Sequence, residues 1–389
     1  MASYPLQVGD SVIVESRYLE DLFQALLNSG YEVIGPTVRD GAIVYDRLTS
    51  AVDLPVGWTD EQSAGKYRLK KRLDQALFGY VVGPHSWKQY LYPPVQRLWR
   101  SERKAKAFSI QPDGNRTARF AFIGVRACEL EAIACQDDVF VHGKYPDPGY
   151  KARRESLFIV AVNCTQAGGN CFCTSMNTGP KVAAGYDLVL TEMPPNGKSI
   201  LLVEIGTERG AEILSDIPHE AASPEIKQAA DHLIADASRH MGRSVDTRSL
   251  KDLLYRSYEN PQWENVAARC LSCGNCTMVC PTCFCTTTED VTDLTGSSAE
   301  RRRRWDSCFT VDFSYIHGGS VRTGGASRYR QWLIHKFATW IEQFGKPGCV
   351  GCGRCISWCP VGIDVTAEVR AIRESETNSK PKDSIREAP

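Results

Sequence analysis

Short apolar runs alternate with segments of helical periodicity along the first 245 residues. Four runs predict buried strands: 118–125, 156–163, 186–193 and 199–205. Segments 126–138 and 207–217 each follow one of these runs and carry apolar residues at helical spacing. Residues 15–48 predict a helix that ends at a glycine and is followed by a pair of strands. Because strands alternate with helices, we predict an α/β domain with a mainly parallel sheet over residues 1–245.

The rest of the chain has a different pattern. Segments 223–241 and 246–263 are polar connectors rich in helix-forming residues. We assign residues 246–370 to an α+β, ferredoxin-like domain with a long insertion over 281–348. The tail, 371–389, is polar and is predicted to be disordered.

Composition and charge exclude several classes of protein. The chain has 389 residues, 42% of them hydrophobic, which is enough for more than one core. Lys plus Arg and Asp plus Glu balance at 46 each, so we expect no nucleic-acid or anionic-membrane partner. The apolar runs are shorter than the roughly 20 residues of a membrane helix. Residues 1–16 lack the pattern of a secretory signal, and we therefore expect a cytoplasmic protein.

The cysteines are the residues that indicate the chemistry of the chain. The chain has 16, concentrated at 164–173, 270–285 and 349–359. In a reducing compartment such spacing indicates metal binding rather than disulfides.

Two stretches share the spacing C-x2-C-x2-C-x3-C-P, the pattern of a two-cluster ferredoxin. In this pattern the fourth cysteine of each run binds the other cluster. We therefore predict that the first 4Fe-4S cluster is held by Cys270, Cys273, Cys276 and Cys359. The second is predicted at Cys349, Cys352, Cys355 and Cys280. Zinc would favour two separated pairs of ligands, which does not explain a triplet plus Cys-Pro occurring twice. The glycines of these loops are expected to let the backbone turn tightly near the sulfurs: Gly274, Gly351 and Gly353.

A third cluster is predicted upstream. Cys128 and Cys164 each follow a predicted strand, and Cys171 and Cys173 lie one Gly-rich loop further on. If the strands are parallel neighbours, these thiols meet at the carboxyl edge of the sheet, where α/β proteins bind ligands. The alternative is that they are small buried residues without a ligand role.

Four cysteines have no assigned ligand role. Cys283 and Cys285 either pack beside the second cluster or complete the upstream site, and the sequence leaves both interpretations open. Cys135 and Cys308 are interpreted as structural.

The insertion is expected to pack over the clusters or against a partner. Its arginine run, Arg301–Arg304, is interpreted as a solvated surface, with a docking patch as the alternative. Four aromatic residues near arginines have the composition of an interface core, the alternative being that they line the domain's own core: Trp305, Tyr315, Tyr329 and Trp332.

Several common motifs are missing from the sequence. There is no G-x-G-x-x-G after a strand, no phosphate-binding G-x-x-x-x-G-K-[ST] and no H-E-x-x-H. No nucleotide, flavin or catalytic site can be recognised. The chain is therefore interpreted as a non-catalytic electron carrier.

The motifs resemble a known family. "RACEL" (126–130), "CLSCGNCTMVCPTCFCT" (270–286), "RYRQWLIHK" (328–336) and "CVGCGRCISWCPVGID" (349–364) are similar to beta subunits of cytosolic bidirectional nickel–iron hydrogenases, or sulfhydrogenases. The resemblance implies an electron-transfer subunit that works with large and small hydrogenase subunits and with a flavin subunit that binds NAD(P). The electron-transfer subunit of anaerobic sulfite reductases is also similar and gives the alternative function. A scaffold protein with purely structural clusters is a third hypothesis.

Overall fold

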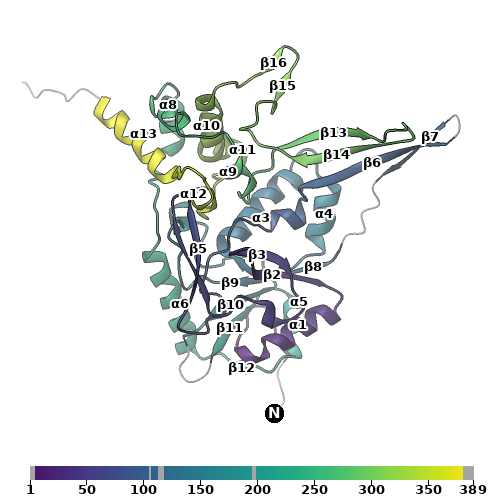
Figure 1. The fold of residues 1–389 in the computed structure, drawn as a ribbon. Coiled ribbons are helices and arrows are strands. Elements are labelled where there is room, and N and C mark those ends of the chain that lie inside the picture. The colour runs from purple at the N-terminus through teal and green to yellow at the C-terminus, as the bar shows by residue number, and fades with distance from the viewer. Residues whose placement is uncertain (1–4, 105–106, 113–117, 195–198, 380–389) are drawn as a thin grey trace, which may run out of the picture.

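A mixed eight-stranded sheet forms the centre of the N-terminal half (Figure 1). The computed structural model describes residues 5–104, 107–112, 118–194 and 199–379. In spatial order the strands are β12 (Glu220–Ala221), β1 (Ser11–Glu15), β11 (Ile200–Ile205), β10 (Leu188–Glu192), β9 (Phe158–Val162), β8 (Phe120–Arg126), β2 (Glu32–Arg39) and β3 (Ala42–Arg47).

The prediction of a mainly parallel sheet holds only at its centre. Strands β2, β8, β9 and β10 are parallel to their neighbours in this group. Strands β3, β11, β1 and β12 pair antiparallel. The connections explain the difference. A parallel crossover needs about a dozen residues, whereas only residues 40–41 join β2 to β3 and residues 193–199 join β10 to β11.

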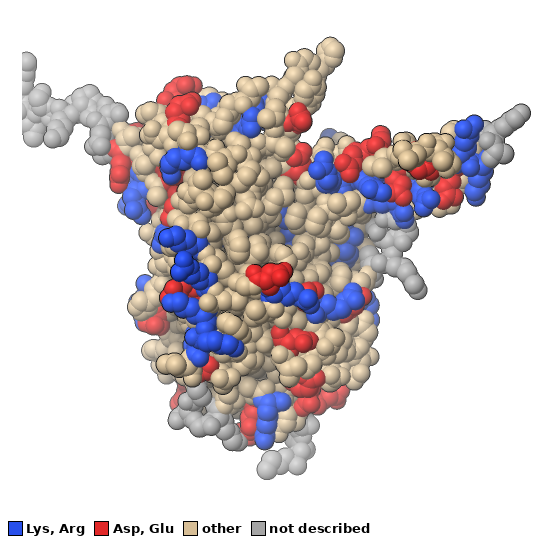
Figure 2. Space-filling view, viewed as in Figure 1, with Lys and Arg blue, Asp and Glu red and all other residues tan. Residues whose placement is uncertain are grey.

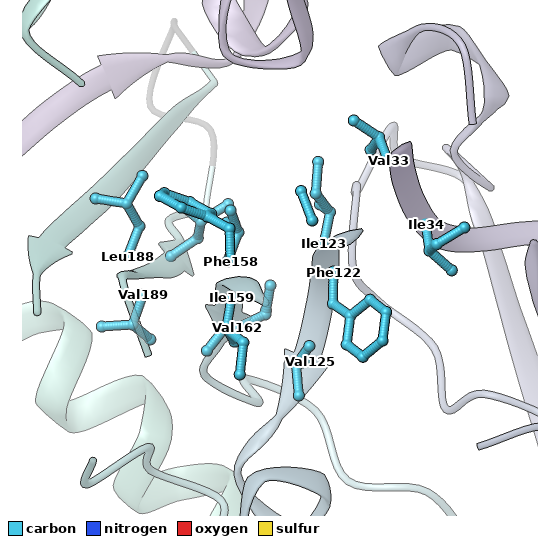
Figure 3. Close-up of a cluster of buried hydrophobic side chains, with 14 of the residues drawn as sticks. Val33, Ile34, Phe122, Ile123, Val125, Phe158, Ile159, Val162, Leu188 and Val189 are labelled. Atoms are coloured by element: carbon cyan, nitrogen blue, oxygen red, sulfur yellow. The ribbon is translucent and has the colours of Figure 1, made fainter. Parts of the chain in front are cut away.

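The central strands are buried on both faces (Figure 3). All five residues of β9 and six of the seven in β8 are buried, which explains why their sequences are continuous apolar runs. The helices of this half are α1 (Leu19–Asn28), α2 (Lys88–Leu91), α3 (Ala127–Phe140), α4 (Pro148–Glu155), α5 (Glu208–Ser215) and α6 (Pro224–Arg239). Helices α1 and α5 contact each other, and α6 contacts β11.

The C-terminal half is built from short helices around a second core. They are α7 (Leu250–Arg256), α8 (Gln262–Ala267), α9 (Asn275–Met278), α10 (Gly325–Ile334), α11 (Trp340–Phe344), α12 (Arg354–Ser357) and α13 (Val365–Ser379). A π-helical turn, His335–Thr339, joins α10 to α11.

Helix α13 corrects the prediction of a disordered tail. The helix continues to Ser379, so residues 371–379 are helical. Ile372 is fully buried in the second core. Arg373 donates hydrogen bonds to the carbonyls of Asp246 and Arg248. These contacts tie the helix to the rest of the fold. The remainder of the predicted tail, 380–389, lies outside the described residues.

A four-stranded sheet projects from the molecule as an arm (Figure 1). Its strands are β13 (Thr286–Thr292), β14 (Ser298–Trp305), β6 (Val95–Lys104) and β7 (Ala107–Pro112). Strands β14 and β6 pair antiparallel, so the insertion shares a sheet with a segment of the N-terminal half. Two small hairpins complete the strands: β4 (Trp58–Ser63) with β5 (Lys66–Lys71), and β15 (Tyr315–Ile316) with β16 (Gly319–Ser320).

The arginine run lies on β14, where each arginine pairs with a carboxylate of this chain. Arg301 pairs with Asp290, and Arg304 pairs with Glu289. The other two arginines pair with Glu300 and Asp147. Figure 2 accordingly shows the arm with positive and negative side chains side by side. The arginine run therefore forms a surface whose positive charges are paired with carboxylates of the same chain.

The four aromatic residues of the insertion do not form one interface. Tyr329 and Trp332 are 2% and 4% exposed in the second core, so the interface interpretation is wrong for them. Trp305 packs against the hydrophobic core of the N-terminal half. Tyr315, at the β15–β16 hairpin, is 63% exposed.

Candidate iron–sulfur centres

Cysteines of both ferredoxin-type motifs line the first cavity. They are Cys355 together with the four that the spacing assigns to the first cluster: Cys270, Cys273, Cys276 and Cys359. The cavity has a volume of about 470 Å³, including its opening to solvent. Cys273 is exposed, and Leu271 on the rim is 63% exposed. This cavity therefore opens at the protein surface.

The second cavity lies deeper. It is lined by Cys280 of the first motif and by three cysteines of the second: Cys349, Cys352 and Cys355. Its volume is about 360 Å³, and Trp332, Phe337 and Val365 form much of its wall. The structure thus brings the fourth cysteine of each motif to the other motif's triplet, as the spacing predicts.

The third cavity is lined by Cys352 of the second motif and by the four upstream cysteines: Cys128, Cys164, Cys171 and Cys173. Its volume is about 480 Å³. Cys128 lies in the first turn of α3, two residues beyond β8, and Cys164 lies two residues beyond β9. Because β8 and β9 are parallel neighbours, both thiols lie at the carboxyl edge of the sheet. This is the edge that the sequence analysis assigned to them.

The loop carrying Cys171 and Cys173 packs directly on the second motif. Gly351 and Gly353 have φ of +66° and +74°, as their predicted role in tight turns requires. A Cβ at Gly351 would lie 2.6 Å from the carbonyl oxygen of Phe172. Only glycine allows this close approach between the third cavity's loop and the second cavity's loop.

Shared cysteines place the three cavities in series. Cys355 lines the first and second cavities, and Cys352 lines the second and third. Trp332 and Val365 also line both the first and the second cavity, so neighbouring cavities share a wall. The second cavity is the middle member of the row.

The chemistry of the thiols fits a metal cluster. Burial raises the pKa of Cys276 and Cys355 well above the usual thiol range, and burial raises the pKa of Cys171 and Cys349 to about 12. Thiols in such apolar walls lose their protons when a metal supplies positive charge. Within the described part of the chain no three His, Cys, Asp or Glu side chains converge on a point suited to a single ion. The cysteines surround a space instead, and four thiolates around a cubane satisfy a 4Fe-4S cluster.

A buried ion pair joins α3 to the second motif. Arg354 and Glu129 are 4% and 2% exposed in their side chains and form a close salt bridge. Glu129 also accepts hydrogen bonds from Tyr45 Oη at 2.5 Å and from Trp87 Nε1 at 3.1 Å. Arg354 also donates to the carbonyl of Gly83. This network fixes the orientation of the loop that carries Cys352 and Cys355.

The two unassigned cysteines of the first motif lie outside the three cavities' walls. The Cys283 thiol hydrogen-bonds Cys280 and is the main cause that lowers the pKa of Cys280. The structure thus favours packing beside the second site and does not place Cys283 in the upstream site. Cys285 hydrogen-bonds Cys308, which lowers the pKa of Cys285 to about 7. Cys135 is 2% exposed in a small apolar cluster, in agreement with a structural role.

Two residues near the second cavity were not singled out by the sequence analysis. Lys336 Nζ lies 3.0 Å from Cys280 Sγ, and Lys88 Nζ donates to the carbonyl of Cys283 at 3.0 Å. Both lysines are almost fully buried. Lys336 is the last residue of "RYRQWLIHK", a segment that resembles the family, but nothing in its local pattern indicates a contact 56 residues away.

Comparisons with known proteins support the two ferredoxin-type sites. Residues 269–363 match the model of a 4Fe-4S dicluster domain. The chain is 27% identical over 367 residues to sulfhydrogenase 2 subunit beta of Pyrococcus furiosus, covering 93% of this chain and 98% of that protein. No solved structure matches the chain. The predicted resemblance to sulfhydrogenase beta subunits is thereby confirmed, and the dicluster domain supports two 4Fe-4S clusters.

Among the described residues, no helix is both long enough and apolar enough to span a bilayer.

Proposed function

We propose that this relative of sulfhydrogenase beta subunits is the electron-transfer subunit of an NAD(P)-linked nickel–iron hydrogenase. The observation that carries the proposal is the row of three cavities, each lined by the four cysteines assigned to it, with Cys355 shared by the first two cavities and Cys352 by the last two. Bound 4Fe-4S clusters would each supply one-electron redox chemistry at a low-potential centre. The similarity to a sulfhydrogenase beta subunit extends over nearly the whole chain, so it includes the third cavity as well as the dicluster domain.

We assign the ligands residue by residue. The first site is held by Cys270, Cys273, Cys276 and Cys359. The second is held by Cys280, Cys349, Cys352 and Cys355. The third is held by Cys128, Cys164, Cys171 and Cys173. The apolar walls exclude water from the second site and thereby protect its sulfurs.

The first site is the one open to a partner. Its rim carries Leu271 and Val361, which are 63% and 39% exposed. Apolar side chains around an exposed redox site suit a protein–protein contact, because their burial stabilises the complex. We therefore propose that another protein of the complex docks over Leu271 and Val361.

The proposed complex has a direct test. A tagged chain isolated from its native host under anaerobic conditions should bring with it three companions: a nickel–iron large subunit, a flavin subunit, and a small subunit that bears clusters. A sirohaem protein in place of the nickel–iron subunit would transfer the assignment to an anaerobic sulfite reductase. A chain that elutes alone would contradict both complexes.

A further inference from the structure

A lysine is buried against one of the cluster ligands. Lys336 lies in the π-helical turn between α10 and α11 and is 5% exposed. Its Nζ lies 3.0 Å from Cys280 Sγ, 3.1 Å from Thr282 Oγ1 and 3.5 Å from the carbonyl oxygen of Gly348. π-Helical turns within α-helices are rare and occur frequently at functional sites. This turn sets the register that brings Lys336 to the second cavity, which it also lines.

The hydrogen-bond partners of Lys336 determine its charge. An ammonium group has three N–H donors and no acceptor. The three contacting atoms are a sulfur, a hydroxyl oxygen and a carbonyl oxygen. Thr282 gives its own hydroxyl proton to Gly348 at 2.7 Å, which leaves its oxygen lone pairs free to accept from Lys336. Thr282 and Gly348 therefore act as acceptors, and Cys280 as a cluster-bound thiolate has no proton to donate, so Lys336 is held as a cation.

The other two cavities have weaker donors to their sulfurs. At the first, backbone amides of Ser272 and Ile363 donate to cysteine sulfurs at 3.4 Å and 3.3 Å. At the third, Arg126 Nη1 lies 3.7 Å from Cys164 Sγ. Among the contacts of the described residues, the charged donor nearest to a ligand sulfur is at the second cavity.

We propose that Lys336 raises the reduction potential of the middle cluster and so makes it the first of the three to be reduced. The inference rests on the proposed function, because it takes Cys280 as a ligand of that cluster. Reduction adds one negative charge to the site. A buried cation and an N–H···S hydrogen bond both stabilise that added charge, since net charge and hydrogen bonds to sulfur set the potential of such clusters.

The test is a redox titration of the anaerobically purified full chain, monitored by EPR. In Lys336→Met the charge and the donors are removed while the length of the side chain is retained. The equilibrium constant for reducing one cluster should fall at least tenfold, which is about 59 mV towards negative potential for a one-electron couple. The other two clusters should shift less, the iron content should stay unchanged, and Lys336→Arg should restore most of the potential.

Lys88→Met is the matched control. Lys88 is 4% exposed, but its Nζ contacts the carbonyl of Cys283 and the ring of Trp305 rather than a ligand sulfur. Its replacement should shift the same potential by less than Lys336→Met does. An equal shift in the two variants, or an unchanged potential in Lys336→Met, would overturn the role of Lys336 and leave the proposed function intact.

A measurement on the unaltered protein covers the case in which the Lys336→Met chain does not assemble. With ¹⁵N-lysine incorporated, pulsed EPR of the first cluster to be reduced should show coupling to a lysine nitrogen. A reduced cluster without that coupling contradicts the inference. Failure of the unaltered chain to bind iron at Cys280, Cys349, Cys352 and Cys355 would instead reject the proposed function itself.

Discussion

The backbone amide of Phe172 donates a hydrogen bond of 2.8 Å to the carbonyl of Gly351. This bond joins the loop between Cys171 and Cys173 to the loop between Cys349 and Cys352. Thr178 Oγ1 adds a second bond, of 2.6 Å, to the carbonyl of Val350. The third cavity is thus fixed to the second motif by one backbone and one side-chain hydrogen bond, which explains how an α/β sheet and a ferredoxin-type segment can present their cysteines in one row.

The third cavity yields the first prediction. The anaerobically reconstituted chain should contain about 12 iron atoms, from three cubanes of four. Replacement of Cys164 or Cys171 by Ser should lower the iron content by about 4, because each cubane needs four thiolates. The EPR signals of the two ferredoxin-type clusters should persist.

Cys135→Ser is the control for this assay. Cys135 is buried on α3 but lines none of the three cavities, so its replacement should leave the iron content unchanged. Unchanged iron in both Cys164→Ser and Cys171→Ser would make the upstream cysteines ordinary buried residues. In that case the chain would hold two clusters only.

The buried pair of Arg354 and Glu129 yields a prediction on stability. Glu129→Gln leaves the Arg354 guanidinium buried without its counter-charge, and breaking such a pair destabilises a protein by about 3–5 kcal/mol. The midpoint of urea denaturation, followed anaerobically, should fall accordingly. Glu155→Gln removes an exposed pair with Lys151 and should change the stability by less than about 1 kcal/mol. If the two variants were equally stable, the pair would not hold the two segments together.

The surface around the first cavity yields a prediction on partner binding. Leu271→Glu places a charge on the apolar rim and should weaken docking of the partner protein about tenfold, or by about 1.4 kcal/mol. The iron content should not change, because the side chain of Leu271 is largely exposed. The measurement is the affinity of the purified chain for the rest of its complex.

Leu294→Glu provides the comparison for that surface. Leu294 is fully exposed in the turn between β13 and β14, at the arm rather than at the cavity. Its replacement should leave binding unchanged. Weakening by Leu294→Glu but not by Leu271→Glu would move the interface to the arm.

The sequence predicted the strands and the cysteine groups well because both signals are local. Strands β8 and β9 are continuous apolar runs, and the ferredoxin-type spacing directly specifies which thiols share a site. The position of Cys128 and Cys164 followed from one further step, the parallel pairing of those two strands.

The features that could not be predicted from the sequence depend on contacts between residues that are far apart in the chain. Strand β14 joins β6 across about 200 residues, and Lys336 reaches Cys280 across 56. Apolar periodicity contains no information on such pairs. The antiparallel return of β11 did have a local signal, because residues 193–199 are too few for a parallel crossover. Helix α13 was missed because Ile372, which anchors its last turns, is one buried residue in a polar segment.

The most direct test of three clusters in series is an anomalous difference map at the iron edge, from crystals of the anaerobically purified chain. Iron density is expected in all three cavities, with Cys355 between the first two sites and Cys352 between the last two. Iron in the first and second cavities alone would contradict the third site and the row of three. Zinc density, or no metal beside Cys270 and Cys349, would contradict the assignment as an electron carrier.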